Sequence, residues 1–472
     1  MHLSALLEFD VVPLDTDDSV SVLLEITAPE REEDAERPPA TLQIVLDRSG
    51  SMGGGRLEGA VRALLALVDR LAPSDHFGLV SFNDQARVEV PCGPLTDKDQ
   101  VRGLISALRA SGGTDLSSGL LRGVQEARRA GADRGATLLL ISDGHANQGI
   151  TDHGLLRQVA ADAYGHGVTT TTLGYGLGYD EELLGVVADG GAGSALFAED
   201  PDTAGGLIAQ EAEYLLAKTA QAVSLRVPSG PLLRGVGVVG EMPFHRLTDG
   251  SVVVELGDFH SGEKRRLLLR MEVPGVASLG TVTVTTMETT YVDPATLTTY
   301  TVTLPVTVNV VPGEEASERA PRPEVRTEEA LQRAQTAKRE ASEALRRGER
   351  DAAVDRLEQA RRDLLGPQAP GASGAGSASS APPPPEVAAQ IAELQRMARM
   401  ARVDDAARTS KTLYASQAGY SRKGGRRQAP ATPSGEEVDR GPRGGRERLI
   451  RGEQTDGGRP TPDGGNRPPQ ET

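Results

Sequence analysis

The sequence predicts an α/β protein built on a doubly wound sheet, with antiparallel strands and a helical segment after it. Short apolar runs alternate with helical patterns up to about residue 217, and a two-residue alternation of valine and threonine follows. A helical periodicity returns beyond residue 325. Alternating strands and helices are typical of a parallel sheet covered on both faces, whereas strands in series are typical of antiparallel sheets.

The first part of this plan, residues 40–217, contains apolar runs that predict buried strands. Residues 41–46 and 137–142 are apolar almost throughout, as strands covered on both faces are. After the first of them, apolar residues spaced three and four apart predict a helix over 56–72 that packs on the sheet. Further strands are expected at 77–82, 87–90 and 168–173, and further helices at 97–109, 116–130, 152–165 and 201–217.

The second part, residues 218–312, is expected to form an antiparallel β-sandwich. Its strands are expected at 222–227, 236–240, 251–256, 265–273, 281–287 and 298–310. Two strands within residues 1–38, at 3–9 and 19–26, can complete it, in which case the doubly wound domain is inserted between the second and third strands of the sandwich. In the alternative, residues 1–35 pair with the doubly wound sheet itself.

The C-terminal part is predicted to be helical and then disordered. Residues 325–365 form two helical stripes that resemble one tetratricopeptide-like hairpin, which cannot bury its apolar face alone. A helical segment over 386–416 can cover that face across a flexible Ala/Ser/Gly/Pro linker, 366–385, or the region can self-associate. An interaction module and a small bundle without a target both fit this pattern. Residues 420–472 are rich in Gly, Pro and Arg, so we expect a disordered tail.

Five oxygen-bearing side chains, Asp47, Ser49, Ser51, Thr114 and Asp143, form the candidate site. The two Asp residues follow predicted buried strands, and ligands bind at the carboxyl ends of such strands. The first three residues are spaced two apart, so in an extended segment their side chains point the same way. Hydroxyl and carboxylate oxygens suit Mg²⁺, Mn²⁺ or Ca²⁺, and only two of these five groups carry charge. A bound ion would therefore keep a position open for water or an incoming carboxylate.

These five positions, in their order and spacing, resemble the metal-ion-dependent adhesion site of the von Willebrand factor type A (VWA) domain family. The resemblance implies a Rossmann-like domain in which the two Ser and one Thr hydroxyls bind Mg²⁺ and the two Asp bind directly or through water. It also implies that a Glu or Asp of a protein partner completes the coordination shell. Residues 173–184, with Gly190, Gly191, Gly193 and Phe197, resemble the last strand and helix of bacterial VWA proteins, and the resemblance covers about residues 40–217.

Composition excludes several other classes of protein. A net charge of −16, 3% aromatic residues and no Trp argue against nucleic-acid binding. The absence of a run of about 18 apolar residues argues against a membrane span. The N-terminus lacks the features of a signal peptide, and the single cysteine, Cys92, fits a reducing compartment, so we expect a cytoplasmic protein. We interpret Cys92 as a small side chain near a strand end, without a role as a nucleophile.

Enzyme signatures are missing from the sequence. It has no Gly-x4-Gly-Lys-Ser/Thr phosphate loop, no Gly-x-Ser-x-Gly elbow and no His-Glu-x-x-His pair. A hydrolase would need a general base near the ion, for which Asp115 could be imagined, but the resemblance implies a structural role for this Asp, and His145 is interpreted as a loop residue. We therefore predict no catalytic residue, and a non-enzymatic module that captures an acidic side chain of a protein partner through a divalent ion. The alternative is an accessory subunit of an AAA+ ATPase machine of the chelatase or MoxR type.

Overall fold

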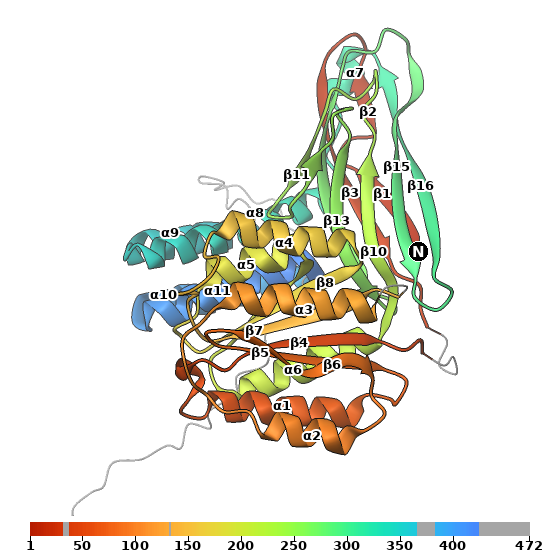
Figure 1. The fold of residues 1–472 in the computed structure, drawn as a ribbon. Helices are drawn as coiled ribbons and strands as arrows, with labels where there is room; N and C mark the ends of the chain where they lie inside the picture. Colours follow the sequence, from red (N-terminus) through yellow and green to blue (C-terminus); the bar gives the residue numbers. More distant parts are fainter. Residues whose placement is uncertain (32–36, 132–133, 366–382, 424–472) are drawn as a thin grey trace, which may run out of the picture. The chain divides into compact units, whose positions relative to one another are not determined.

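A computed structural model describes residues 1–31, 37–131, 134–365 and 383–423 (Figure 1). One six-stranded sheet, in the order β6-β5-β4-β7-β8-β9, lies in the region predicted to be doubly wound. Neighbouring strands of this sheet are parallel, except that β5 and β6 are antiparallel. The strands are β4 (Thr41–Asp47), β5 (His76–Phe82), β6 (Ala86–Pro94), β7 (Ala136–Ser142), β8 (Val168–Tyr175) and β9 (Ala192–Ala198).

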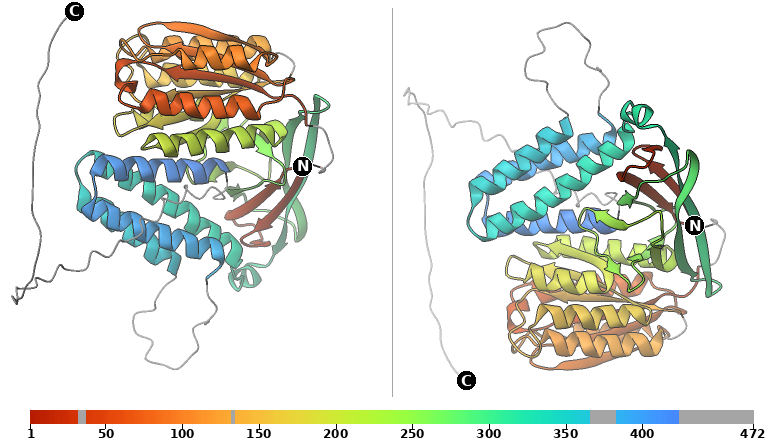
Figure 2. Two further views of the ribbon diagram at one scale, coloured as in Figure 1. Left: turned by 90° about the horizontal axis from the view of Figure 1, so that it is seen from below. Right: turned by 90° about the horizontal axis from the view of Figure 1, so that it is seen from above.

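Helices cover both faces of this sheet (Figures 1 and 2). One face packs against α1 (Arg56–Arg70), α2 (Lys98–Ser106) and α6 (Pro201–Leu216), and the other against α3 (Leu116–Ala130), α4 (His153–Gly165) and α5 (Glu181–Gly190). Strand β4 shows why two layers form: Ile44 and Leu46 are buried in the core with α1, whereas Val45 between them is buried in the core with α3. Alternate residues of a strand face opposite sides, so an all-apolar strand needs a helical layer on each side. The predicted α/β doubly wound domain is confirmed.

The remaining strands form two further sheets that share one hydrophobic core. The four-stranded sheet has the order β1-β3-β14-β11, and the second six-stranded sheet has the order β12-β13-β10-β15-β16-β2. Val22 and Leu24 of the first sheet and Leu225 of the second are fully buried in that core. The strands are β1 (His2–Leu7), β2 (Val11–Pro13), β3 (Asp18–Thr27), β10 (Lys218–Val227), β11 (Gly235–Val239), β12 (His245–Arg246), β13 (Val252–His260), β14 (Lys264–Val273), β15 (Gly280–Asp293) and β16 (Thr298–Val311).

The N-terminal strands pair within these two sheets. Strand β3 pairs antiparallel with β14, from Thr27 opposite Lys264 to Asp18 opposite Val273. Strands that precede and follow the doubly wound part in the sequence are thus neighbours, and the alternative in which residues 1–35 join the doubly wound sheet is wrong for the described residues. The prediction of purely antiparallel pairing is also wrong, because β2 runs parallel to β16. This three-residue strand lies in the crossing between β1 and β3 of the other sheet, so the connection sets its direction.

The C-terminal helices are α8 (Pro323–Arg346), α9 (Arg350–Leu365), α10 (Pro385–Val403) and α11 (Ala406–Lys423), and the short α7 (Gly313–Ser317) precedes them. The four long helices share a core that includes Leu345, Leu357, Leu394 and Leu413. The hairpin thus buries its apolar face against the segment that follows it in sequence. Helix α8 also covers the outer face of the four-stranded sheet, where Val325 packs with two leucines of that sheet. No helix in the described ranges combines the length and apolar character that a bilayer crossing requires.

Three predicted boundaries in this region need correction. Residues 386–416 are two helices, since the chain is extended at Asp404 and the Asp405 carboxylate accepts a hydrogen bond from the Arg408 N–H at the start of α11. Helix α11 continues to Lys423, so the predicted disordered tail cannot begin at residue 420. Helix α10 begins at Pro385, the last residue of the predicted linker. Residues 366–382 and 424–472 lie outside the described residues.

Candidate functional site

The two Asp residues of the candidate site lie where predicted, at the carboxyl edge of the doubly wound sheet. Strand β4 ends at Asp47, and Asp143 directly follows the end of the neighbouring strand β7. Both side chains are buried. The Ser142 hydroxyl donates a 2.6 Å hydrogen bond to Asp47 Oδ2, and the Ser49 N–H donates to Asp47 Oδ1 at 2.8 Å. The two strand ends are therefore joined to each other through the Asp47 carboxylate.

The serine hydroxyls converge on the second Asp. Ser49 Oγ lies 3.0 Å from Ser51 Oγ, and Ser51 Oγ donates a 2.7 Å hydrogen bond to Asp143 Oδ1. The backbone that achieves this differs from the prediction, because Gly50–Met52 forms a 3-10 turn (η1) and not a continuous extended segment. The glycines at 54 and 55 have positive φ angles and let the chain leave this turn directly into α1. The hydroxyls of Ser49 and Ser51 thus lie close together, although the backbone between them is a turn and not the predicted extended segment.

Thr114 reaches the site from a different loop. The N–H of Gly50 donates to the Gly112 carbonyl at 3.0 Å, which fastens the serine loop to the threonine loop. The Thr114 backbone exchanges hydrogen bonds with Asn147: its N–H donates to Asn147 Oδ1 at 3.0 Å, and its carbonyl accepts from the Asn147 N–H at 3.1 Å. A Cβ placed on Gly144 would lie 3.5 Å from Ser51 Oγ and 3.6 Å from Thr114 Oγ1, so both hydroxyls border the same small space.

The electrostatics of the site favour a cation. Burial raises the pKa of the Asp47 carboxyl, and the nearby charge of Asp143 acts in the same direction, although hydrogen bonds from Ser142 and Ser49 oppose the shift. A guanidinium already compensates part of this negative charge, because Arg56 Nη1 lies 2.6 Å from Asp143 Oδ2. The arrangement is therefore a pair of buried carboxylates surrounded by hydroxyl oxygens, with one arginine at its edge.

Three of these contacts were not predicted from the sequence. Ser142 is adjacent to Asp143, and its position at the end of a buried strand beside β4 was the available signal. Asn147 carried no signal, because loop asparagines are common. Arg56 was counted only as the first residue of a helix, although it is both the start of α1 and a contact of Asp143.

The two groups considered for other chemistry have structural contacts. Asp115 caps α3, because its Oδ1 accepts hydrogen bonds from the Ser118 N–H at 2.9 Å and from the Ser117 hydroxyl at 2.6 Å. Cys92 is buried, and burial raises the pKa of its thiol to about 12, which agrees with its interpretation as a small packed side chain near a strand end.

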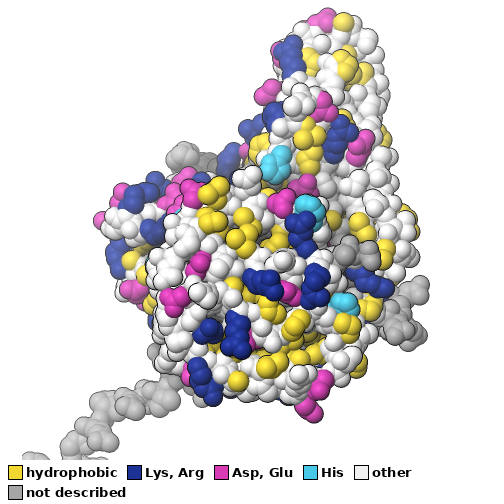
Figure 3. All heavy atoms as spheres, viewed as in Figure 1, with side chains coloured by type: hydrophobic (Ala, Val, Ile, Leu, Met, Phe, Trp, Pro, Cys, Tyr) yellow, Lys and Arg dark blue, Asp and Glu magenta, His cyan; other side chains and the backbone are white. Residues whose placement is uncertain are grey.

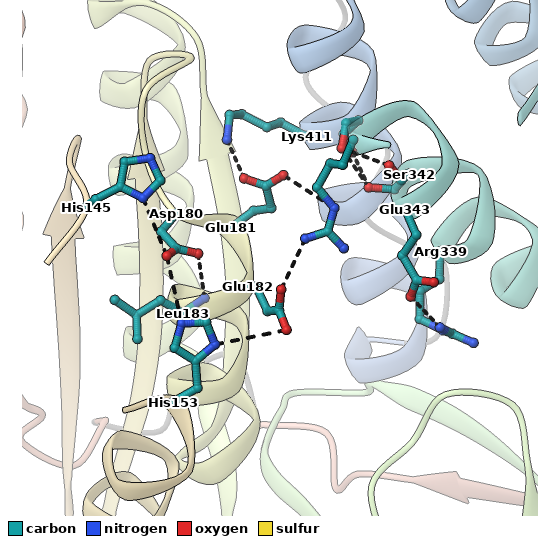
Figure 4. A network of polar contacts seen from close by, with 12 residues as sticks. His145, His153, Asp180, Glu181, Glu182, Leu183, Arg339, Ser342, Glu343 and Lys411 are labelled. Atoms are coloured by element: carbon teal, nitrogen blue, oxygen red, sulfur yellow. Dashed lines mark hydrogen bonds and ion pairs between the residues drawn. The ribbon is translucent and has the colours of Figure 1, made fainter. Parts of the chain in front are cut away.

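His145 lies on the loop beyond Asp143 and is mostly exposed. Its Nδ1 is 3.5 Å from Asp180 Oδ2, and Asp180 in turn caps α5 by accepting a hydrogen bond from the Leu183 N–H (Figure 4). The next residue of α5, Glu181, is paired with Lys411 of helix α11. The segment between β8 and α5 is thus held between the site loop and the C-terminal helices.

An open surface groove lies between α3 and α4, with a volume of about 600 Å³. Its apolar lining consists of Leu121, Val124, Ile150, Leu155 and Val159, and the two leucines are 45% and 51% exposed. Hydrophobic side chains and basic side chains both lie on this face of the molecule (Figure 3). The Ile150 N–H donates to the Ser117 hydroxyl, so the groove begins on the same loop that carries Asp143.

A doubly wound sheet with this set of oxygen-bearing side chains at its carboxyl edge is typical of the von Willebrand factor type A class. The sequence model of the family, described as von Willebrand factor type A domain, matches residues 42–210. These residues are a VWA domain. Such domains typically mediate protein–protein interactions.

Relatives with this domain are known from several organisms. The chain is 34% identical over 169 residues to the uncharacterized protein sll0103 of Synechocystis, covering 36% of this chain and 40% of that protein. It is 26% identical over 229 residues to the uncharacterized protein YfbK of Escherichia coli, covering 48% and 40%. Inter-alpha-trypsin inhibitor heavy chain H1 of Sus scrofa is 28% identical over 172 residues, covering 34% and 19%. The chain thus matches less than half the length of each of these relatives.

Two solved structures share the wider fold. A von Willebrand factor type A protein from Catenulispora acidiphila has a TM-score of 0.66 at 16% identity, covering 88% of this chain and 96% of that one. The ArnB paralog VWA2 from Sulfolobus acidocaldarius has a TM-score of 0.59 at 14% identity, covering 89% and 98%. At these identities the likeness concerns the fold alone, and it extends beyond the VWA domain.

Proposed function

We propose that this protein is a non-enzymatic binding module that captures an acidic side chain of a protein partner through a divalent ion. The observation that carries the proposal is the convergence of Ser49, Ser51 and Asp143, whose oxygens form a chain of contacts of 3.0 and 2.7 Å beside the buried Asp47. Ser49, Ser51 and Thr114 would hold the ion through hydroxyls, and Asp47 and Asp143 would balance its charge. When bound, Mg²⁺, Mn²⁺ or Ca²⁺ supplies a positive centre with room for an outside oxygen ligand.

The ligand set fits such an ion for two physical reasons. All five side chains offer oxygen, which Mg²⁺ prefers, and no thiolate or imidazole is among them. The Asp47 carboxyl is costly to keep charged at full burial, as its raised pKa indicates, and a divalent ion would offset that cost.

A protein, and not a small anion, is supported as the partner by the apolar groove between α3 and α4. Leu121 and Leu155 expose apolar surface in this groove, which a protein side chain could cover. The loop that begins at Asp143 also supplies Ile150 to the groove, so one partner could contact both features. A role without catalysis is supported by Asp115, whose carboxylate is engaged in capping α3. The alternative role as an ATPase accessory subunit stays a prediction, because no contact among the described residues favours it.

Calorimetric titration of the full chain with Mg²⁺ tests the ion site. We expect binding by the wild type, and a loss of affinity of at least about tenfold in Asp47→Asn and Thr114→Val, since ion sites typically lose this much when one supporting group is removed. Asp162→Asn, an exposed carboxylate change on α4, is the matched control and should bind like the wild type. Circular dichroism checks that each variant is folded.

Affinity capture from a lysate of the source cells, with and without EDTA, tests the second half of the proposal. A protein retained by the wild type, released by EDTA and missing from Thr114→Val supports capture through the ion. Equal Mg²⁺ affinity in wild type and Asp47→Asn, or capture that EDTA does not change, would contradict the proposal.

A further inference from the structure

Arg56 occupies a defined position at the edge of the candidate ion site. Its Nη1 lies 2.6 Å from Asp143 Oδ2 and donates a second hydrogen bond of 3.0 Å to the Ser51 carbonyl. A third segment encloses the same side chain: a Cβ on Gly176, after β8, would lie 3.1 Å from Arg56 Nε, and the φ of that glycine is +77°. Glycine at this point leaves room for the guanidinium. The arginine is thus held by the η1 turn, the end of β7 and the end of β8.

The two oxygens of Asp143 have different partners in this arrangement. Oδ1 accepts the hydrogen bond from Ser51, on the side of the hydroxyl ligands, whereas Oδ2 faces Arg56. The carboxylate is fully buried, and the arginine side chain is 38% exposed. An arginine keeps its positive charge at any ordinary pH, so this cation is present whether or not an ion is bound.

A divalent ion and Arg56 would therefore share one carboxylate. The positive charge of the arginine repels a second cation placed nearby, and its hydrogen bond withdraws part of the Asp143 charge that the ion would use. Once loaded, two carboxylates, one guanidinium and one divalent ion leave one net positive charge, which favours an acidic partner over a neutral one. Removing the arginine would strengthen ion binding.

We propose that Arg56 sets the affinity of the ion site by competing with the divalent ion for Asp143. The inference rests on the proposed function, since it requires an ion at the five oxygens. A purely structural role for Arg56 would predict a different result, because loss of a structural contact loosens Asp143 and weakens ion binding.

Titration of the full chain with Mn²⁺ alone, followed by calorimetry at low and high salt, distinguishes these roles. We expect Arg56→Gln to bind Mn²⁺ about tenfold more tightly than the wild type, in line with the loss of one hydrogen bond between charged groups. Arg56→Lys keeps the charge and should stay close to the wild type. The matched control is Arg70→Gln at the other end of α1, where the arginine pairs with Glu213 and should not affect the ion.

High salt provides a readout that a structural role would not change. Because the arginine is partly exposed, salt should screen its repulsion and reduce the difference between Arg56→Gln and wild type. If Arg56→Gln does not fold, Arg56→Met retains the aliphatic stem and should show the same gain. Unchanged or weaker Mn²⁺ binding in the neutral variants, with normal binding by the wild type, overturns the role of Arg56 alone. No binding in wild type and variants alike overturns the proposed function and this inference with it.

Discussion

Replacement of Lys411 by methionine tests how firmly the C-terminal helices are attached to the VWA domain. Lys411 projects from α11, and its Nζ donates a 2.6 Å hydrogen bond to the Tyr179 carbonyl and pairs with Glu181 (Figure 4). The ammonium also lies 4.1 Å from the centre of the Tyr179 ring. The lysine side chain is 5% exposed and that of Glu181 is 11% exposed, so this ion pair is shielded from water.

The expected loss of stability follows from the Glu181 carboxylate, which would stay buried without its lysine partner. Removing one partner of a buried ion pair costs about 3–5 kcal/mol, because the other charge stays buried without compensation. Arg346 Nε, 4.0 Å from Glu181 Oε1, would compensate part of that charge, and methionine would keep most of the apolar packing of the lysine stem. We therefore expect Lys411→Met to lower the free energy of unfolding by about 3 kcal/mol, near the lower end of that range.

Urea unfolding followed by circular dichroism measures this change. Lys264→Met is the control: this lysine pairs with Glu25 at 3.5 Å but is 49% exposed, so its loss should cost at most about 1 kcal/mol. The double variant Lys411→Met/Glu181→Gln should be less destabilised than the sum of the single variants, because it leaves no unpaired carboxylate. A loss below about 1 kcal/mol in Lys411→Met would show that the contact is not a buried ion pair in solution.

Two further predictions concern groups with shifted pKa values. Burial pushes up the pKa of the Asp75 carboxyl, but hydrogen bonds from Arg37 and from the N–H groups of Ala40 and Ala72 outweigh it and hold the pKa below 3.8. A carboxyl with a lowered pKa in the folded state stabilises above its unfolded pKa, and this stability is lost as the pH falls through the folded value. The urea midpoint should therefore fall less between pH 7 and pH 3 in Asp75→Asn than in wild type, and equal falls would refute this. Cys92, whose pKa burial raises to about 12, should react with iodoacetamide at pH 8 about a thousandfold more slowly in the native chain than in urea, and fast native labelling would contradict the burial of the thiol.

The candidate site was predictable where its chemistry is local in the sequence. Asp47 and Asp143 each follow a run of apolar residues, and such runs must be buried strands, so both carboxylates had to lie at one sheet edge. The assignment of Thr114 to the site depended on the resemblance to the VWA family, since no pattern in its own loop indicates that it lies near Asp47 and Asp143. Arg56 escaped prediction because its contact with Asp143 spans 87 residues and arises from where the η1 turn ends.

The fold was likewise predictable where its elements have a regular local pattern, and the prediction failed where an element is short or depends on distant contacts. Periodicity indicated the helices and strands of the doubly wound domain except α5 and β9, because each of the others buries one face or two over a regular pattern. It did not indicate the parallel pairing of β2, which has only three residues. It also did not indicate the break at Asp404, where one short polar segment separates two apolar stripes of the same period.

The segment between β8 and α5 has contacts with the candidate site, with the C-terminal helices and with the loop that begins at Asp143. Gly176 borders Arg56 of the candidate site, Tyr179 receives Lys411 of the C-terminal helices, and Asp180 contacts His145 on the loop that begins at Asp143. The positive φ of Gly176 and the helix cap formed by Asp180 both depend on the position of the backbone. A shift of this segment would therefore change the space available to Arg56. By contacting Tyr179 and Glu181, Lys411 of α11 holds the segment that borders Arg56, so the proposed ion site would depend on the C-terminal helices through this segment.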